Sequence, residues 1–433
     1  MNIIDIIENK KTGNELTKGE IEFFINGYNN GEITDYQAAA LIMAICINGM
    51  TVDEISDLTI AMANSGEMLD LSDIASNTVD KHSTGGIGDK ITLILMPIMA
   101  SMGIPIVKMS GRGLGITGGT VDKLQSIPGY KTDIEIDEVK KNVKEIGIAL
   151  ISQSANLAPA DKKIYALRDT IACVDSTPLI ASSIMSKKIA SGAQNIILDV
   201  TCGKGAFMET KSDAKTLSKV MKNIGKNAGR NVMCILTNMN EPVGYSVGNS
   251  LEVVEAVKAL RGDMTEDVRE IILTFGSYML KMAGLGDDLE ENEKKIVKEI
   301  ESGKAYKKFL ELVGKQGGDT SYIENLEKFE KAPIIVPVVS NKSGFVTDLS
   351  AELIGRASVD LGAGRLKKED DIDPRVGIIV CKKTGDKVSK DEIMAYVHAN
   401  DPKKADEAVL KVRNAYTILD KKVKKPSVIL DVL

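Results

Sequence analysis

The sequence predicts an α/β fold in which a small all-helical domain is hinged to a large α/β domain with a mixed, β-rich C-terminal part. Three patterns lead to this prediction. Helical patterns with capping signals occupy residues 1 to about 65, strand and helix patterns then alternate around two glycine-rich loops, and short apolar runs separated by Gly, Asp and Lys turns begin at about residue 334. The 433 residues suffice for about two to four domains of ordinary size.

The N-terminal segment is expected to form several short helices. Thr17, Thr34 and Thr51 are each followed three residues later by Glu or Gln, which is the capping-box pattern of a helix start. Residues 38–47 are apolar nearly all round, so their helix is expected to be buried or to lie in a dimer interface. Residues 64–67, Asn-Ser-Gly-Glu, interrupt the helical pattern and are expected to form a hinge.

Two glycine-rich loops, residues 80–90 and 108–120, carry the clearest functional signal. Glycine allows positive φ angles and a close backbone approach to a ligand, and the N–H groups of such a loop before a helix can bind an anion. The groups suited to an anion in the two loops are lysines and hydroxyls, namely Lys81, Lys108, Ser83, Ser110 and Thr120. Because glycine, lysine and hydroxyl coincide twice, we expect one phosphate to be held from two sides.

Strand and helix patterns alternate after the hinge, which is typical of an α/β sheet. Strands are expected at 104–107, 148–151, 196–200 and 232–237, and helices at 89–102, 120–126, 139–146, 211–229 and over much of 249–330. Helices at 164–170 and 182–191 are expected to rejoin the N-terminal helices. The predicted domains are 1–65 plus about 162–193, about 70–160 plus 194–330, and 331–433.

Charge and cysteine usage limit the partners and the compartment. The formal net charge is −6 and the pI is about 5.4, which disfavours nucleic acid or an anionic membrane as a partner. The five cysteines are widely spaced and form no Cys-x-x-Cys motif, so neither a zinc site nor a disulfide framework is indicated. The first residues carry no signal-peptide pattern, and the apolar run at 38–47 is too short to cross a bilayer. We therefore expect a cytoplasmic protein.

A second group of polar residues lies in the helices that return to the N-terminal part. Ser183 and Lys187 are four residues apart and would share one face of a helix. With the rigid donor fork of Arg168 they could bind a flat heterocycle that carries carbonyl oxygens and a ring N–H. Spacing alone favours a plainer interpretation, in which Arg168 is a surface residue and the other two form a polar helix pair.

Long motifs in a fixed order extend the argument to most of the chain. They are Lys81-His82-Ser83-Thr84-Gly85-Gly86, Ser110-Gly111-Arg112-Gly113-Leu114-Gly115, Thr117-Gly118-Gly119-Thr120, Asp122-Lys123-Leu124, Ala166-Leu167-Arg168-Asp169, residues 179–188, Gly205-Ala206-Phe207-Met208 and Pro242-Val243-Gly244-Tyr245. With these motifs the chain resembles the pyrimidine-nucleoside phosphorylase and thymidine phosphorylase family. The resemblance implies phosphorolysis of a pyrimidine nucleoside to the free base and a (deoxy)ribose 1-phosphate.

The resemblance also implies a role for each matching side chain. Phosphate would be bound by Lys81, Ser83, Lys108, Ser110 and Thr120, and the pyrimidine by Arg168, Ser183 and Lys187, with Leu114 and Tyr165 lining the base. His82, Arg168 and Lys187 would be catalytic, because the two cations would stabilise negative charge on the departing base and His82 would donate a proton or hydrogen bond to it. A homodimer formed through the helical domain is implied as well.

A potassium ion is a further implication of the resemblance, because some family members hold one. Its positions here would be Gly88, Val243, Ser246 and Glu255, the middle two through backbone carbonyls. Lys90 stands at a further position that is Thr in some of those members. A lysine beside a cation disfavours the ion unless its side chain swings away.

The chain departs from the family pattern at a few positions in and near the loops. Ile116 stands where the family has a histidine, Thr201 replaces a lysine, and Asn240 replaces an aspartate. Lys204 is a candidate to restore the positive charge lost at Thr201. The change at Ile116 leaves the preferred base and sugar open.

Two other functions fit parts of the same pattern. A magnesium-dependent phosphoribosyltransferase of related fold would share the Thr-Gly-Gly loop, although the acidic pair that would hold magnesium is not visible beside residues 207–209. A non-catalytic nucleoside- or phosphate-binding protein would keep the loops without turnover. A requirement for inorganic phosphate, for magnesium or for neither distinguishes the three.

Overall fold

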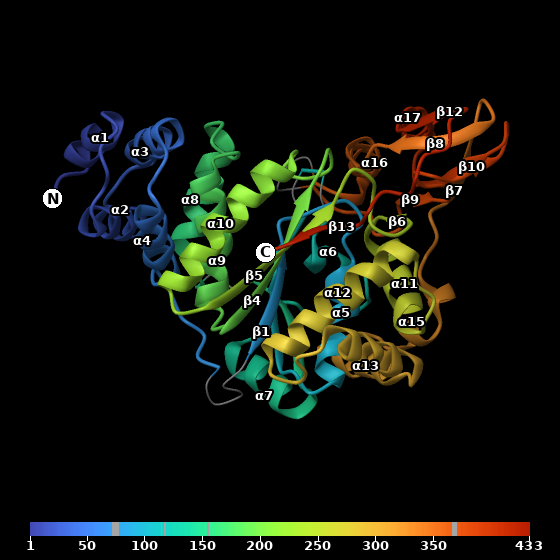
Figure 1. Ribbon diagram of the computed structural model, residues 1–433, viewed down its shortest axis with the longest axis horizontal. Helices are drawn as coiled ribbons and strands as arrows, with labels where there is room; N and C mark the ends of the chain where they lie inside the picture. Colours follow the sequence, from blue (N-terminus) through green and yellow to red (C-terminus); the bar gives the residue numbers. More distant parts are fainter. Residues whose placement is uncertain (72–77, 114, 117, 154–155, 366–369) are drawn as a thin grey trace.

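The computed structural model describes residues 1–71, 78–113, 115–116, 118–153, 156–365 and 370–433. N-terminal helices form one end of the molecule, a sheet flanked by helices forms the middle, and small strands from the C-terminal part form the other end (Figure 1). The predicted class, helical bundle plus α/β part plus β-rich part, is confirmed by this arrangement.

The helical part is built from two separate segments of the chain. It contains α1 (Ile3–Lys11), α2 (Lys18–Asn30), α3 (Asp35–Asn48) and α4 (Val52–Ala63), joined by α8 (Pro159–Thr170) and α9 (Thr177–Ala190). Phe24 and Leu41 share one apolar core with Ile164 and Leu179 from the second segment. The predicted return of the chain to the N-terminal helices is therefore confirmed.

Local signals explain where these helices begin. The N–H groups of Thr17 and Thr51 each donate to the Glu three residues later, at 2.7 Å, as the capping-box pattern predicts. Helices α8 and α9 begin earlier than predicted, with Pro159 and Pro178 in their first turns. Proline favours this position because it lacks the N–H that a first turn leaves unbonded.

The large part is organised around a sheet with the strand order β1-β4-β5-β13. Its strands are β1 (Val79–Ser83), β4 (Asn195–Cys202), β5 (Asn231–Asn238) and β13 (Ile429–Val432), and β2 (Ile106–Ser110) pairs separately with β3 (Ile148–Ser152). Strands β1, β4 and β5 run parallel, whereas β13 is antiparallel to β5. The carboxyl ends of β1 and β2 lead into the two glycine-rich loops, which is where α/β sheets bind ligands.

The large part also contains the helices that connect and follow these strands along the chain. They are α5 (Ile91–Ser101), α6 (Thr120–Gln125), α7 (Ile136–Ile146), α10 (Lys211–Asn227), α11 (Asn249–Leu260), α12 (Glu266–Met282), α13 (Leu289–Glu301), α14 (Lys304–Lys315) and α15 (Ser321–Glu324). Ile196 and Leu198 of β4 pack in the core that contains α9 and α10, whereas Ile197 packs in the core that contains α5 and α12. Alternate residues of one strand thus supply two cores, as the pleat of a strand requires.

The C-terminal part holds two small antiparallel sheets. Their elements are β7 (Ile334–Val339), β8 (Gly344–Leu349), α16 (Ala351–Ser358), β9 (Gly377–Val380), β10 (Lys387–Val388), β11 (Ile393–Ala399), α17 (Pro402–Asn414) and β12 (Tyr416–Leu419). The orders are β10-β8-β12 and β6-β9-β11-β7, where β6 (Ser246–Val247) comes from the preceding part of the chain. In the same way, β13 comes from the C-terminal part but pairs with β5 of the central sheet. Each part thus contributes a strand to a sheet of the other, and the domain boundary at 331 stays a prediction.

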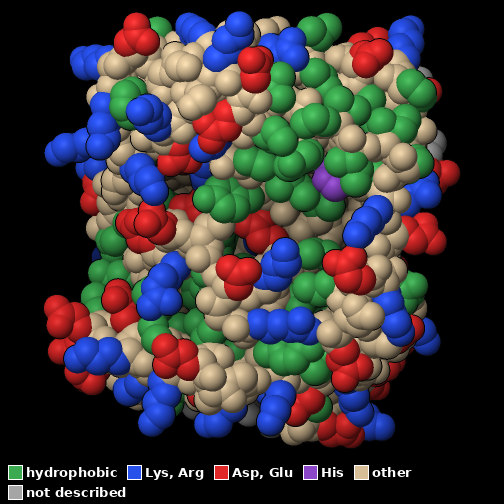
Figure 2. All heavy atoms as spheres, turned by 90° about the vertical axis from the view of Figure 1, so that its right-hand side faces the viewer, with side chains coloured by type: hydrophobic (Ala, Val, Ile, Leu, Met, Phe, Trp, Pro, Cys, Tyr) green, Lys and Arg blue, Asp and Glu red, His purple; other side chains and the backbone are tan. Residues whose placement is uncertain are grey.

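The surface near this end shows no segregation of charge. Figure 2 shows Lys and Arg interspersed with Asp and Glu over the face it presents, with hydrophobic side chains gathered in the upper half. Within the described ranges, no helix is both long enough and apolar enough to span a bilayer.

The chain crosses between the helical and the large part where glycine is sterically required. Glu67 donates its N–H to the carbonyl of Asn156 at 2.9 Å, and Leu69 donates to that of Ala190 at 2.8 Å, so three crossing segments lie side by side. A Cβ atom on Gly66 would lie 2.0 Å from the oxygen of Asn156, and one on Gly192 would lie 2.2 Å from that of Leu69. The predicted hinge region is therefore packed backbone against backbone.

We expect Gly66→Ala to destabilise the protein, because its Cβ would overlap a backbone carbonyl that cannot rotate away. Overpacking of this kind costs about 1–3 kcal/mol, and the measurement is the free energy of unfolding from urea titration. Gly19→Ala is the matched control, because its Cβ would meet only the flexible end of Met1, at 3.5 Å, inside α2. Equal stability of the two variants would contradict the close approach.

Candidate functional site

One cavity of about 790 Å³ is lined by both glycine-rich loops and by both helices of the second helical segment. The loops contribute His82, Thr84, Ser110 and Arg112, and the helices contribute Tyr165, Arg168, Ser183 and Lys187. The structure therefore brings the predicted phosphate side and the predicted base side to one place. Lys81, Ser83, Lys108 and Thr120 are not among the lining residues, and Leu114 lies outside the described residues.

Lys81 lies on β1 and is completely buried among carboxylates. Its Nζ is 3.0 Å from Oδ2 of Asp199 on β4 and 3.7 Å from Oδ2 of Asp89 in the first loop. Burial alone would lower the pKa of Lys81, but the two carboxylates outweigh it and the pKa is raised. Lys81 is therefore a permanent positive charge at the base of the first loop. Ser83, at the end of the same strand, accepts the N–H of Gly85 at 3.2 Å.

Lys108 lies on β2 in a different electrostatic setting. Its Nζ donates to the carbonyl of Met109 at 2.9 Å and lies 3.9 Å from Oδ1 of Asp80, while the other oxygen of Asp80 accepts from Lys188 at 2.6 Å. Burial, followed by the charge of Lys188, lowers the pKa of Lys108 to about 7. Lys108 therefore changes its charge near neutral pH.

Ser110, at the end of β2, presents an unused polar atom to the cavity. Its Oγ is buried and has no hydrogen-bond partner among the described residues, although the residue lines the cavity. A buried hydroxyl without a partner is costly, and a bound ligand would supply one. This is the arrangement expected for a hydroxyl that binds phosphate.

The second loop is held in shape by Asp122, in the first turn of α6. Its carboxylate accepts the backbone N–H of Gly113 at 2.6 Å and the guanidinium groups of Arg365 at 2.9 Å and Arg112 at 3.3 Å. Thr120 is the first residue of α6. The loop thus closes on the start of its own helix.

Lys123 connects the two loops. Its buried Nζ donates to the carbonyl of Asp89 in the first loop at 2.6 Å and pairs with Glu252 of α11 at 2.7 Å. Lys123 therefore ties the helix that follows the second loop to the first loop.

Arg168 is 2% exposed at the end of α8 and faces the cavity. Its guanidinium donates to the carbonyls of Cys173 at 3.0 Å, Leu179 at 3.0 Å and Val174 at 2.6 Å. These contacts fix the plane of the guanidinium and the turn between α8 and α9. Because a guanidinium has five N–H donors, two remain for a ligand. The surface-residue interpretation of Arg168 is wrong.

Ser183 and Lys187 share one face of α9, as predicted. Lys187 donates to Oγ of Ser183 at 2.9 Å and pairs with Asp161 of α8 at 2.6 Å. The ring of Tyr165 lies beneath both cations, with its centroid 5.8 Å from Nζ of Lys187 and 5.9 Å from Cζ of Arg168. Two cations, a hydroxyl and an aromatic ring thus line one end of the cavity.

His82 lines the cavity from the carboxyl end of β1. Burial lowers the pKa of His82 well below its usual value, and the charges of Lys188, Lys108, Lys187 and Lys81 lower it further. The imidazole is therefore neutral at physiological pH. A neutral imidazole can donate a hydrogen bond, and it gains a proton only when negative charge develops beside it.

The four positions expected for potassium are brought together around Lys90. Nζ of Lys90 donates to the carbonyls of Val243 at 2.7 Å and Ser246 at 3.0 Å and to Oε2 of Glu255 at 2.9 Å. The carbonyl of Gly88 accepts the backbone N–H of Lys90 at 2.9 Å. The side chain does not swing away from the predicted ion position but points into it.

The departures from the family pattern have separate positions. Thr201 donates from Oγ1 to the carbonyl of Gly85 at 2.6 Å, so it holds the first loop by hydrogen bonding. Nζ of Lys204 lies 3.6 Å from Asp348 on a side chain that is 62% exposed, and Lys204 does not line the cavity. Its position gives no support to the idea that Lys204 restores the charge lost at Thr201. Ile116 lines the cavity.

Sequence reasoning missed the acidic residues that hold the cations. Asp80, Asp161 and Asp199 each pair with a lysine of the site, and none was predicted. A usable signal existed for Asp199, because a charged residue within the apolar run 196–200 is rarely buried without a partner.

Comparisons with known proteins agree with this architecture. Family models match residues 4–66 (glycosyl transferase family, helical bundle domain), 75–306 (glycosyl transferase family, a/b domain) and 345–419 (pyrimidine nucleoside phosphorylase C-terminal domain). Proteins named pyrimidine-nucleoside phosphorylase from Staphylococcus aureus strains COL and MW2 are 49% identical over 420 residues, 97% of this chain and 97% of each relative. The crystal structure of anthranilate phosphoribosyltransferase from Thermus thermophilus matches with a TM-score of 0.60 and 16% identity, covering 72% of this chain and 99% of that one, which shows a shared fold. The chain belongs to the pyrimidine-nucleoside phosphorylase family.

Proposed function

We propose that this protein phosphorolyses pyrimidine (deoxy)nucleosides to the free base and (deoxy)ribose 1-phosphate, in nucleoside salvage or catabolism. The reaction would take place in the cavity between the glycine-rich loops and α8–α9. The observation that carries the proposal is that Ser110 with the loop backbone and Arg168 with Lys187 line the same cavity. Relatives 49% identical over nearly the whole chain carry the name pyrimidine-nucleoside phosphorylase. The membership of the family and the geometry of the cavity support the same activity.

The base side of the cavity is suited to a departing pyrimidine. As the N-glycosidic bond breaks, the sugar becomes oxocarbenium-like and the base gains negative charge on N1 and on its carbonyl oxygens. Arg168 and Lys187 are positioned to stabilise that charge, and they are already oriented by protein carbonyls and by Asp161. Pre-oriented charges are effective because they need no reorganisation at the moment of reaction.

The loop side is suited to the attacking phosphate. The loop N–H groups and Ser110 would hold phosphate for attack on C1′ from the face opposite the base, with inversion at the sugar, and the buried lysines of β1 and β2 would add positive charge behind them. Placing two substrates in this way can contribute about 7–11 kcal/mol to catalysis. His82, which is neutral, would donate a hydrogen bond from its ring N–H to the base as negative charge develops there.

The phosphoribosyltransferase alternative shares the fold but receives less support. The solved anthranilate phosphoribosyltransferase is only 16% identical to this chain, so the match supports a shared fold and not a shared reaction. The cationic face made by Arg168 and Lys187 fits a base that leaves with negative charge.

The test of the proposed function is a panel of pyrimidine nucleosides incubated with inorganic phosphate, with release of the base followed by ultraviolet absorbance. We expect base release to require phosphate and not to require magnesium. Lys187→Met should lower kcat about 10²–10³-fold, as for loss of one donor to a developing anion. Release that needs magnesium and a ribosyl pyrophosphate, or binding of nucleoside without any release, would overturn the proposal.

The matched control for that experiment is Lys163→Met on the same helix as Tyr165. The ammonium of Lys163 donates to the carbonyl of Asn29 at 2.6 Å, away from the cavity lining. Its kcat should stay near wild type. Circular dichroism melts of both variants separate loss of activity from loss of fold.

The pKa of Lys108, about 7, predicts how phosphate binding depends on pH. Only the protonated ammonium attracts the phosphate dianion, so the affinity is full below that pKa and falls as pH rises through it. We expect the KM for phosphate, expressed as the concentration of the dianion so that the titration of phosphate itself is removed, to rise about tenfold for each pH unit above about 7, measured from initial rates. In Lys108→Met the KM should be higher at acidic pH and nearly independent of pH above neutrality. A wild-type KM that stays flat over this range would exclude Lys108 from the phosphate site.

The homodimer is proposed from an exposed apolar stripe on α3. Tyr36, Ala40, Met43 and Ile47 are all exposed and follow one another at spacings of four, three and four residues, so they lie along one face of the helix. Tyr36 and Ile47 are each 74% exposed. A continuous apolar face of this kind fits a second copy of the helical part.

The cytoplasmic location remains a prediction that rests on composition and cysteine spacing.

We expect the wild-type protein to sediment as a dimer in analytical ultracentrifugation and Ile47→Glu to shift it toward the monomer, because a carboxylate would be buried in an apolar interface. Ile335→Glu, at an isoleucine of β7 that is 45% exposed, is the matched control and should remain dimeric. A monomeric wild type, or dissociation of both variants alike, would contradict an interface on α3.

A further inference from the structure

The ammonium of Lys90 is completely buried and fully bonded. Its three N–H groups are matched by three acceptors, the carbonyls of Val243 and Ser246 and one oxygen of Glu255, at 2.7, 3.0 and 2.9 Å. An ammonium has three donors and no acceptor, so this set uses all of them. The single carboxylate also balances the single positive charge.

The acceptors around Lys90 are the kind that an alkali-metal ion uses. Backbone carbonyls and a carboxylate can replace the water shell of potassium. The carboxylate of Glu255 is oriented by two backbone hydrogen bonds, because its oxygens also accept the N–H groups of Tyr245 at 2.8 Å and Ser246 at 2.6 Å. The four residues expected to bind potassium are thus assembled, but the side chain of Lys90 already engages three of them.

The backbone of Gly88 and Gly244 lies close around the ammonium of Lys90. A Cβ built on Gly88 would lie 2.6 Å from the oxygen of Val243 and 3.5 Å from Nζ of Lys90, and one built on Gly244 would lie 2.7 Å from that Nζ. A metal ion there would meet a positive charge instead of an acceptor. The residues present therefore do not fit potassium.

We propose that the ammonium of Lys90 is a built-in cation that replaces the potassium ion of other family members, so that this chain requires no alkali-metal ion. The consequence is structural: Lys90 ties the segment Val243–Ser246 to the start of α5, directly after the first glycine-rich loop. A covalently attached cation keeps this connection at any ionic composition.

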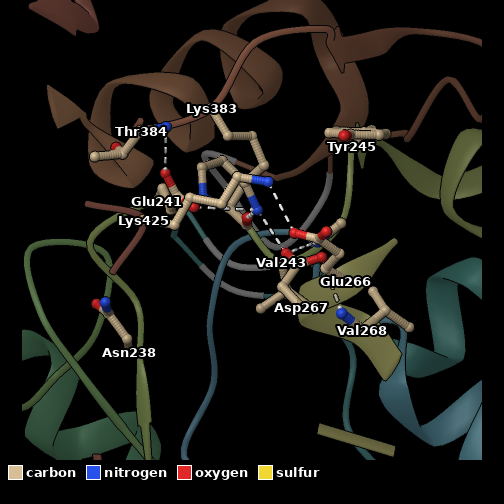
Figure 3. Close-up of polar contacts among 12 residues, drawn as sticks. Asn238, Glu241, Val243, Tyr245, Glu266, Asp267, Val268, Lys383, Thr384 and Lys425 are labelled. Atoms are coloured by element: carbon tan, nitrogen blue, oxygen red, sulfur yellow. Dashed lines mark hydrogen bonds and ion pairs between the residues drawn. The ribbon is translucent and has the colours of Figure 1, made fainter. Parts of the chain in front are cut away.

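A second lysine, Lys383, binds the residue directly before this segment. Two ammonium groups, those of Lys90 and Lys383, therefore bind this stretch of backbone. Nζ of Lys383 donates to the carbonyl of Pro242 at 2.8 Å and to Asp267 at 2.5 Å and lies 3.4 Å from Glu241 (Figure 3). The carbonyls of Pro242 and Val243 are consecutive, so one is bound by Lys383 and the next by Lys90. Removing Lys90 would leave the inner carbonyls unsatisfied while the outer contact remained.

A vacated ammonium position would be accessible from solvent. Ser246 and Glu255 both line a second cavity, of about 600 Å³, in which carboxylates such as Asp263 and Glu270 outnumber lysines. A cation could therefore reach the oxygens of Ser246 and Glu255 once the lysine is shortened. Threonine at position 90 would provide that space together with a hydroxyl oxygen.

The experiment compares Lys90→Thr with wild type in potassium chloride and in choline chloride of equal ionic strength. We expect the wild-type melting temperature and phosphorolysis rate to be the same in both salts. Lys90→Thr should melt several degrees lower in choline chloride and recover with potassium chloride in a saturable way. The melting temperature needs no catalysis, so this result is independent of the proposed activity.

Lys10→Thr is the matched control, because Lys10 is also a buried lysine, with Glu54 at 2.7 Å and the carbonyl of Asn14 at 3.4 Å. It should melt lower than wild type in both salts without specific recovery in potassium. A wild type that is stabilised or activated by potassium would overturn the proposal, as would a folded Lys90→Thr that shows no preference for potassium over choline. If Lys90→Thr folds only when prepared in potassium chloride and unfolds on dialysis into choline chloride, the proposal is supported.

Discussion

The carboxylate of Asp80 joins the two halves of the cavity. It lies on β1, one residue before Lys81, and binds Lys188 of α9 at 2.6 Å, while Lys108 of β2 lies 3.9 Å from its other oxygen. Helix α9 carries Ser183 and Lys187, which line the cavity from the helical side, and His82 of β1 and Ser110 of β2 line it from the loop side. A buried charge that loses its partner is strongly destabilising, so this contact fixes the helix against the strands at one position.

The same buried cluster explains why neighbouring lysines differ in charge. Lys81 is 3.0 Å from Asp199, and that attraction exceeds the cost of burial, so its pKa is raised. Lys108 has its carboxylate at 3.9 Å and a competing ammonium on Lys188, so burial prevails and its pKa falls to about 7. Attraction weakens with distance while the loss of solvation does not. The buried cluster therefore combines one lysine that stays charged with one whose charge changes near neutral pH.

Patterns that are local in the sequence allowed much of this arrangement to be predicted. The capping boxes, the glycine-rich loops and the pairing of Ser183 with Lys187 each depend on residues a few positions apart, and helical periodicity specifies such neighbours. Asp80 and Lys188 are separated by 108 positions, and no local pattern relates them. The carbonyls that orient Arg168 could not be inferred either, because every residue has a carbonyl and only the folded turn selects three. The starts of α8 and α9 were missed, although a proline in the first turn is itself a local signal for a helix start.

Strand β13 has a consequence for how the protein is made. Residues 429–432 pair with β5, nearly two hundred positions earlier, and so cover the outer edge of the central sheet. During synthesis β5 emerges long before this partner, and an uncovered strand edge is a template for association with other chains. The nascent protein therefore carries an incomplete sheet until residues 429–432 have been synthesised. Truncation before β13 would expose the same edge permanently and favour aggregation of molecules whose site residues are all present.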